Sequence, residues 1–204
     1  MLLGTDNQGK TAWHAAAASD ISVSLQNIWQ CAKEILTTGE LKKLLLRTDN
    51  QGKTAWHAAA ASDISVILPN LWKCAKEIPT REELHKLVLV TDNRGMTAFQ
   101  LAAGWGTSAK LQNMWQCAKE TLTTEELNKL LLVSDNEGMN AWNLAATSSN
   151  SKTLEKVWQC AIETLTTEEL NKLVLGTDIQ GMTTWQVGAL QRHYKMSGSV
   201  LKRN

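Results

Sequence analysis

Apolar residues recur along the chain at helical spacing, in short stretches separated by polar turns. One such stripe consists of Leu25, Ile28, Trp29 and Ala32, which follow the spacing i, i+3, i+4, i+7 and predict an amphipathic helix. A shorter apolar stripe follows Thr54, whose hydroxyl can cap the first turn of a helix. The pattern therefore predicts a short helix and then a longer one.

A third helix is predicted by a capping box, in which a Thr and a Glu three residues later satisfy each other's backbone N–H groups. This Thr-x-x-Glu pattern occurs at Thr37 and Glu40, Thr80 and Glu83, Thr123 and Glu126, and Thr166 and Glu169. Each pair precedes apolar residues at helical spacing.

All of these features return with a fixed step of 43 residues, which is typical of a stacked repeat array. The step is kept by Asp6, Asp49, Asp92, Asp135 and Asp178, by Trp29, Trp72, Trp115 and Trp158, and by Cys31, Cys74, Cys117 and Cys160. We therefore expect a single repeat domain over 1–204, with units 5–47, 48–90, 91–133 and 134–176, a partial fifth unit 177–191 and a polar, basic tail 192–204.

The turn and first helix carry a family resemblance. The motif Asp-x-x-Gly-x-Thr-Ala-Trp-His-x-Ala-Ala, at 6–17 and 49–60, resembles the ankyrin repeat, which reads Asp-x-x-Gly-x-Thr-Pro-Leu-His-x-Ala-Ala. The resemblance implies an all-α solenoid, although ankyrin repeats have about 33 residues and the surplus here is the third helix. An armadillo-like solenoid of three-helix units is the alternative.

Composition narrows the possible functions. The net charge of +1 gives no general attraction to nucleic acid, and no apolar run reaches the roughly 20 residues that span a bilayer. We expect an intracellular, cytoplasmic protein. Because the sequence has no phosphate-binding loop, metal-spaced cluster or nucleophile elbow, we predict no metal, no cofactor and no enzyme activity.

The four cysteines occupy one position of the repeat, so we expect them on stacked helices about 8–10 Å apart. That spacing is too large for a disulfide or for shared metal ligands, and it predicts that the cysteines pack as small hydrophobic residues. His14 and His57 are replaced by Gln or Asn in later units, which argues against catalytic Cys–His pairs. The ankyrin resemblance implies instead that these histidines tie neighbouring units together, with Thr11, Thr54 and Thr97.

Nine tryptophans are present, and eight of them keep the repeat register, which favours packing in the core. Trp105 breaks the register in a Gly104-Trp105-Gly106 stretch, which we interpret as a loop. Because Trp is enriched at binding hot spots, Trp105 is a candidate contact with a partner, although it can equally fold back onto the alanine-rich helices.

The resemblance implies a non-catalytic interaction module that binds a protein partner through its turn tips and first helices. The candidate partner-binding residues are Trp105, Gln8, Lys10, Gln51, Lys53, Arg94, Met96, Glu137 and Met139. Two alternatives remain: a segment of a longer ankyrin-type scaffold, or a Cys/His-based enzyme or ligand-binding protein. The chain also opens with MLLG, like the end of a unit, so an uncapped N-terminal face predicts possible self-association.

Overall fold

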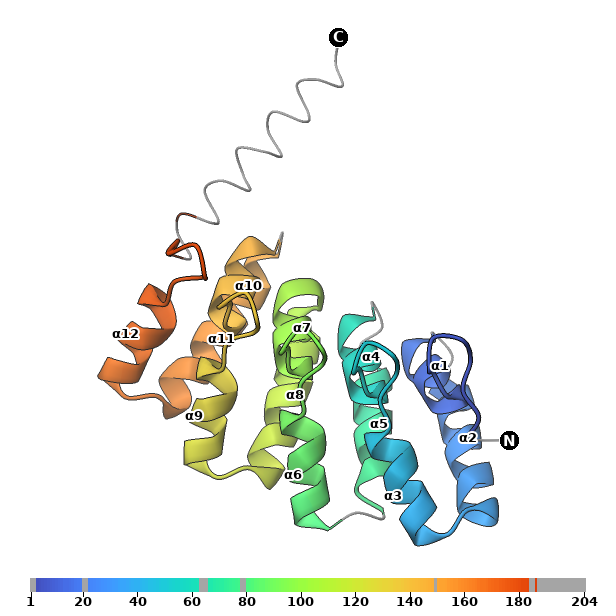
Figure 1. The fold of residues 1–204 in the computed structure, drawn as a ribbon. Helices are drawn as coiled ribbons and strands as arrows, with labels where there is room; N and C mark the ends of the chain where they lie inside the picture. Colours follow the sequence, from blue (N-terminus) through green and yellow to red (C-terminus); the bar gives the residue numbers. More distant parts are fainter. Residues whose placement is uncertain are drawn as a thin grey trace.

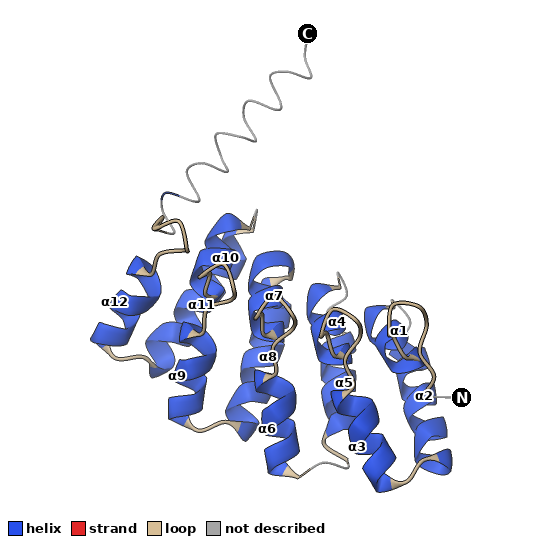
Figure 2. Ribbon diagram, viewed as in Figure 1, coloured by secondary structure: helices blue, strands red, loops and turns tan. Residues whose placement is uncertain are grey.

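The computed structural model describes residues 3–19, 22–62, 66–77, 80–148, 150–183 and 186. Within these residues the protein is all-helical, with isolated β-bridges and no longer strand (Figure 2). The helices are α1 (Ala12–Ala18), α2 (Ser22–Ile35), α3 (Thr38–Leu46), α4 (Ala55–Ala61), α5 (Ile67–Ala75), α6 (Arg81–Leu89), α7 (Ala98–Trp105), α8 (Ser108–Thr121), α9 (Thr124–Leu132), α10 (Ala141–Thr147), α11 (Ser151–Thr164) and α12 (Thr167–Leu175).

Each repeat contributes three helices, and the four units lie side by side in chain order (Figure 1). First helices pack on first helices, second on second and third on third, so each unit contacts the next through equivalent elements. The prediction of an all-α fold with three helices per unit is confirmed. The basic tail 192–204, the first helix of the fifth unit apart from Gln186, and Pro79 lie outside the described residues.

The Asp-x-x-Gly turns form a hydrogen-bonded ladder along the stack. Gly52 has a φ of 75°, where a side chain is strained, and a Cβ there would also collide with Asn93 of the next turn. Asp49 Oδ1 accepts from the backbone N–H groups of Gln51 and Lys53, which fixes the turn. The Asn50 N–H donates to the Gln8 carbonyl at 2.9 Å, and the same bond recurs at each later turn.

The first helices are joined through the residue at the His position. His14 Nδ1 accepts from the Thr11 N–H at 3.2 Å, and its Nε2 lies 3.0 Å from the Lys53 carbonyl of the next unit. His57 makes the same pair of contacts, with Thr54 and with the Met96 carbonyl. These bonds require a neutral imidazole, and burial lowers the pKa of both histidines.

In the third unit an amide occupies the same position. Gln100 Oε1 accepts from the Thr97 N–H at 2.8 Å, and its Nε2 donates to the Met139 carbonyl at 3.0 Å. A side-chain amide therefore replaces the imidazole as a donor and acceptor that joins two units.

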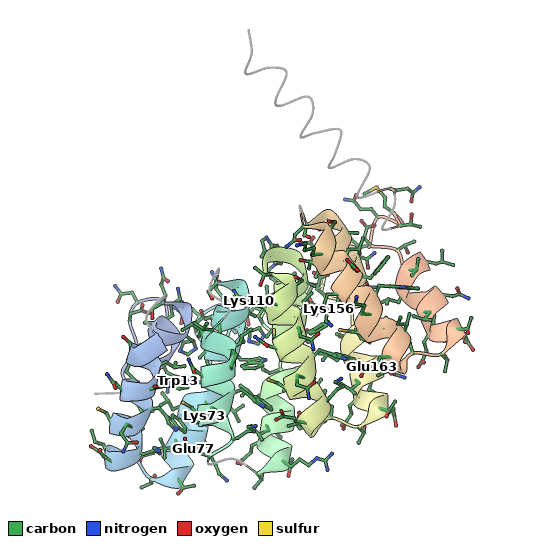
Figure 3. All side chains as sticks on the ribbon, turned by 180° about the vertical axis from the view of Figure 1, so that it is seen from behind. Trp13, Lys73, Glu77, Lys110, Lys156 and Glu163 are labelled. Carbon is green, nitrogen blue, oxygen red and sulfur yellow. The ribbon has the colours of Figure 1, made fainter. Side chains whose placement is uncertain are left out.

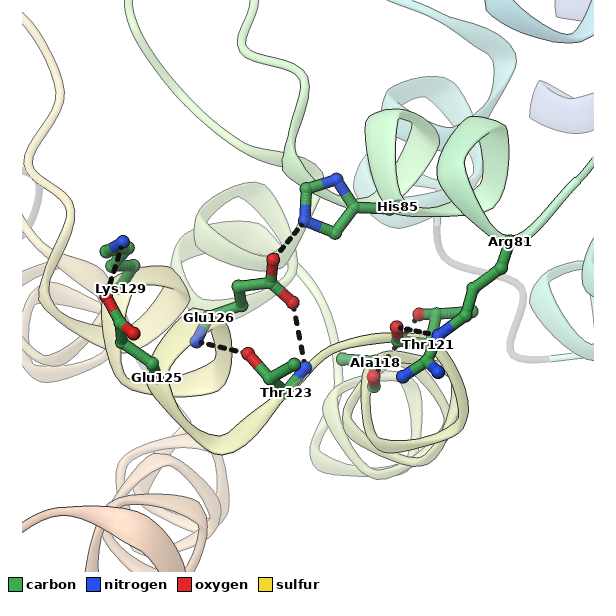
Figure 4. A network of polar contacts seen from close by, with 8 residues as sticks. All are labelled: Arg81, His85, Ala118, Thr121, Thr123, Glu125, Glu126 and Lys129. Carbon is green, nitrogen blue, oxygen red and sulfur yellow. Dashed lines mark hydrogen bonds and ion pairs between the residues drawn. The ribbon is translucent and has the colours of Figure 1, made fainter.

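The third helices are linked through the glutamates of their capping boxes. Glu126 accepts from the Thr123 N–H at 2.8 Å and from His85 of the preceding unit at 2.7 Å (Figure 4). Its pKa is lowered, mainly by the Thr123 hydrogen bond. Equivalent contacts join Lys42 to Glu83 and Asn128 to Glu169.

Candidate functional site

The second helices have one side that faces the following unit, and this side repeats with high regularity. Leu111 and Trp115 of α8 are 0% and 1% exposed because α11 covers them. The indole N–H of each covered tryptophan donates to a glutamate one unit further on. These pairs are Trp29 with Glu77 at 3.0 Å, Trp72 with Glu120 at 2.9 Å and Trp115 with Glu163 at 2.8 Å.

A lysine one turn after each tryptophan reaches the same carboxylate. The ion pairs are Lys33 with Glu77, Lys76 with Glu120 and Lys119 with Glu163, at 2.7, 3.0 and 2.7 Å. Figure 3 shows two of these carboxylates, Glu77 and Glu163, from behind the stack. The Lys119 and Trp115 hydrogen bonds lower the pKa of Glu163, so the carboxylate is ionised at neutral pH.

In the last described unit this side of the second helix is open. Trp158 of α11 is 37% exposed, and Leu154 is half-buried where its counterpart Leu111 is fully buried. Among the described residues, Trp158 has no carboxylate partner of the kind that the three preceding tryptophans have. Within the part of the chain that the structure describes, the side that units one to three bury against a neighbour is therefore uncovered in the fourth.

A groove of about 430 Å³ follows this open side. Its lining is almost entirely apolar and consists of Trp142, Ser151, Leu154, Glu155, Trp158 and Val174. The rings of Trp142 and Trp158 pack with their centroids 5.5 Å apart, and they form one wall. Three elements, α10, α11 and α12, hold the groove in place.

The residue at position 162 distinguishes this groove from the internal interfaces. Lys33, Lys76 and Lys119 precede it at 43-residue steps, but position 162 holds Ile, which is 54% exposed. We name Trp142, Leu154, Trp158, Ile162 and Val174 the end face. The repeat register predicts Trp158 as a core residue and so does not indicate this face, although the Lys-to-Ile change is visible in the same register.

Several sequence-predicted binding residues lie elsewhere. Gln8, Lys10, Gln51, Arg94 and Glu137 are exposed at the turn tips and Lys53 is half-buried there. Met96 and Met139 are a correction, because both are buried, with 0% and 9% of the residue exposed, and neither contributes to a surface.

Trp105 is the last residue of α7 and is not in a loop, which is a second correction. It is 52% exposed, the Arg94 guanidinium lies 5.9 Å from its ring centroid, and Arg94 also pairs with Glu137 at 3.7 Å. Arg94 of the third turn thus contacts both Trp105, at the end of α7, and Glu137 of the next turn, away from the end face.

The cysteines give no reactive site where they are buried. Burial raises the pKa of Cys74 to about 11 and the pKa of Cys117 and Cys160 to about 12, so these thiols stay protonated. Cys31 is exposed, contrary to the packing prediction, because it lies on the side of α2 that a preceding unit covers in the other three. Within the described ranges no group of three His, Cys, Asp or Glu side chains could hold a metal ion.

None of the described helices combines the length and the apolar character needed to cross a membrane. No protein-family model and no curated protein matches the sequence. Among solved structures, the chain is similar to a chain in the structure of the Bd0816 predatory endopeptidase from Bdellovibrio bacteriovorus in complex with immunity protein Bd3460. The match has a TM-score of 0.60 and 14% identity, and it covers 100% of this chain and 86% of the other. At this identity the likeness establishes a shared fold.

This likeness corrects two predictions. The sequence indicated a non-catalytic module that binds through turn tips and first helices, and it indicated that the chain is not an enzyme. Both are wrong as stated, because the fold is shared with the structure of an endopeptidase bound to its immunity protein.

Proposed function

We propose that the chain binds another protein through the end face. The observation that carries this proposal is the contrast between equivalent positions, since the same side of the second helix is buried in three units and open in the fourth. An exposed apolar groove bordered by a tryptophan is typical of protein interaction sites. The structurally similar chain comes from a complex of two proteins, which also supports the proposal.

The replacement of lysine by Ile162 supports the same reading. A solvent-facing end of a repeat array normally carries polar residues, because an apolar end invites association. Here the change runs the other way, from Lys119 to Ile162, and it enlarges the apolar area at the end face. The proposed surface differs from the turn tips and makes no statement about catalysis.

The family assignment is also part of the proposal. We propose that the units are divergent ankyrin repeats extended by a third helix. Support comes from the Asp-x-x-Gly turns with positive φ at glycine and from the capping boxes of the first helices.

Site-directed photo-crosslinking in cells of the source organism tests the function. The crosslinking residue replaces Ile162 on the end face or, as a matched control, Ile35, an exposed isoleucine at the opposite end of the stack. We expect a covalent adduct with one other protein from position 162 and none of that mass from position 35. The absence of any adduct from position 162, or identical adducts from both positions, would contradict the proposal.

A further inference from the structure

We infer that the end face receives an amphipathic helix of another protein, and that this helix brings a carboxylate to the indole N–H of Trp158. The inference rests on the proposed function and specifies the chemistry of the partner. It follows from how the protein fills three equivalent grooves within its own stack.

The internal grooves show what shape fits. The counterparts of the end face in the first three units are covered by α5, α8 and α11, which are amphipathic helices of 9, 14 and 14 residues. The wall residues Trp142, Leu154 and Trp158 repeat the types of Trp13, Leu25 and Trp29 in the first unit. A groove with the same wall and the same supporting helices accepts the same kind of occupant.

The indole N–H groups of the tryptophans indicate which charge the occupant of the end face carries. In each internal interface the indole N–H donates to an ionised glutamate at 2.8 to 3.0 Å, and these glutamates have lowered pKa values. A hydrogen bond to a charged group is stronger than one between neutral groups. Trp158 presents the same donor at the same place on its helix, so a carboxylate is the complementary group.

Ile162 distinguishes the expected partner from another repeat unit of this kind. In the internal interfaces the carboxylate is held by both tryptophan and lysine, whereas at the end face the lysine is absent. The occupant therefore gains one charge-assisted bond from Trp158 and apolar contact from Ile162. We expect a helix that is more apolar at this point than α5, α8 or α11.

Two other occupants fit less well. The turn of the fifth unit already holds the next place in the ladder, because the Ile179 N–H donates to the Glu137 carbonyl at 3.0 Å. A second copy of the chain would have to displace this turn in order to add its first unit in register. The tail 192–204 contains no Asp or Glu, and positions 201 and 203 hold Leu and Arg where the four units have Trp and Cys.

A peptide with the sequence of α11 serves as the probe, because α11 fills the preceding groove and carries Glu163. A 14-residue helix is marginal alone, so the peptide is stapled into helical form and labelled with a fluorophore. Fluorescence anisotropy with the full chain measures its affinity. The protein variant Trp158→Phe keeps the ring but removes the N–H, and the peptide variant Glu163→Gln removes the charge.

We expect saturable binding that weakens about tenfold with either change, and no further weakening when both are combined. The control Trp105→Phe, on an exposed tryptophan away from the groove, should leave the affinity unchanged. Absence of saturable binding would overturn the inference, as would additive effects of the two changes or an equal loss with Trp105→Phe.

The other occupants give distinct results. If the peptide does not bind the parent chain but binds the chain that carries Val200→Asp and Leu201→Asp, the tail is the occupant of the groove. Concentration-dependent dimerisation that Ile162→Lys abolishes would identify a second copy. Either result overturns the inference. If crosslinking from position 162 captures a protein but the peptide does not bind, the inference fails and the proposed function stands, whereas loss of both results rejects both.

Discussion

Trp115 and Trp158 occupy the same position on α8 and α11, yet one is 1% exposed and the other 37%. Their helices have the same length and similar sequences, and the aromatic neighbours Phe99 and Trp142 pack on them in similar ways. The difference lies in the neighbour, because α11 covers Trp115 and none of the described second helices covers Trp158. In a repeat stack the burial of a residue is thus set by the adjacent unit.

We expect the largest difference in unfolding free energy between variants of two leucines at equivalent positions. Leu111→Ala leaves a cavity between two units and should lower the free energy of unfolding by about 3 kcal/mol, whereas Leu154→Ala at the end face should lower it by about 1 kcal/mol. Urea unfolding monitored by circular dichroism measures both. Equal losses would mean that the end face is as well packed as the interior.

A second pair of variants isolates the indole hydrogen bond. Trp115→Phe removes the bond to Glu163, which is partly exposed and keeps Lys119, so we expect a loss of about 1 kcal/mol. Trp158→Phe should change the free energy of unfolding by less than about 0.5 kcal/mol, as for a surface substitution. A large loss from Trp158→Phe would show that its N–H already has a partner in the free chain.

Acidification should weaken the contacts that His14 and His57 make with the next unit before it weakens the contact that Gln100 makes. Burial lowers the folded-state pKa of His14 and His57 below the ordinary 6.5, so the unfolded chain takes up protons first as pH falls. The stabilisation is therefore present above pH 6.5 and is lost as pH falls below it. Hydrogen exchange at pH 7 and pH 5 should show faster opening of α1 and α4 but not of α10, because Gln100 of α7 links the third unit to the fourth through the Met139 carbonyl.

The matched variant replaces the histidines of the first two units with glutamine, the residue that the third unit has at this position. His14→Gln with His57→Gln should flatten the dependence of unfolding free energy on pH between 5 and 7. A slope equal to that of the parent chain would show that other groups control it.

The smallest effect concerns the first-helix tryptophans. The Nε1 atoms of Trp13, Trp56 and Trp142 are buried without a hydrogen-bond partner. Trp56→Phe removes an unsatisfied donor but also some packing, and these terms oppose each other, so we expect a change within about 1 kcal/mol. A loss as large as that of Leu111→Ala would show that the ring volume dominates.

Local signals predicted the helices well. The capping boxes at Thr37, Thr80, Thr123 and Thr166 depend on four consecutive residues, and each is present at the start of a third helix. The 43-residue step then carries each assignment to the next unit. Features set by neighbouring residues in the chain were therefore readable from the sequence.

The solvent exposure of individual side chains was predicted less well, because it depends on contacts between units. Met96 and Met139 occupy the register of Lys10, which is exposed, yet both are buried. Cys31 and Trp158 keep the register of buried residues but lie on opposite ends of the stack, where one side has no described neighbour. Ile162 was the available signal, since an apolar residue in a lysine register marks a change of partner.

The measurement that tests the end face most directly is NMR of the tryptophan indole N–H groups in the ¹⁵N-labelled chain, with Trp158 assigned through Trp158→Phe. We predict that in the free chain the Trp158 N–H exchanges rapidly with water, while the N–H groups of Trp29, Trp72 and Trp115 are protected. Adding the helical peptide should protect the Trp158 N–H and shift its resonance downfield. A Trp158 N–H that is protected in the free chain, or that stays exposed in the complex, would contradict the account.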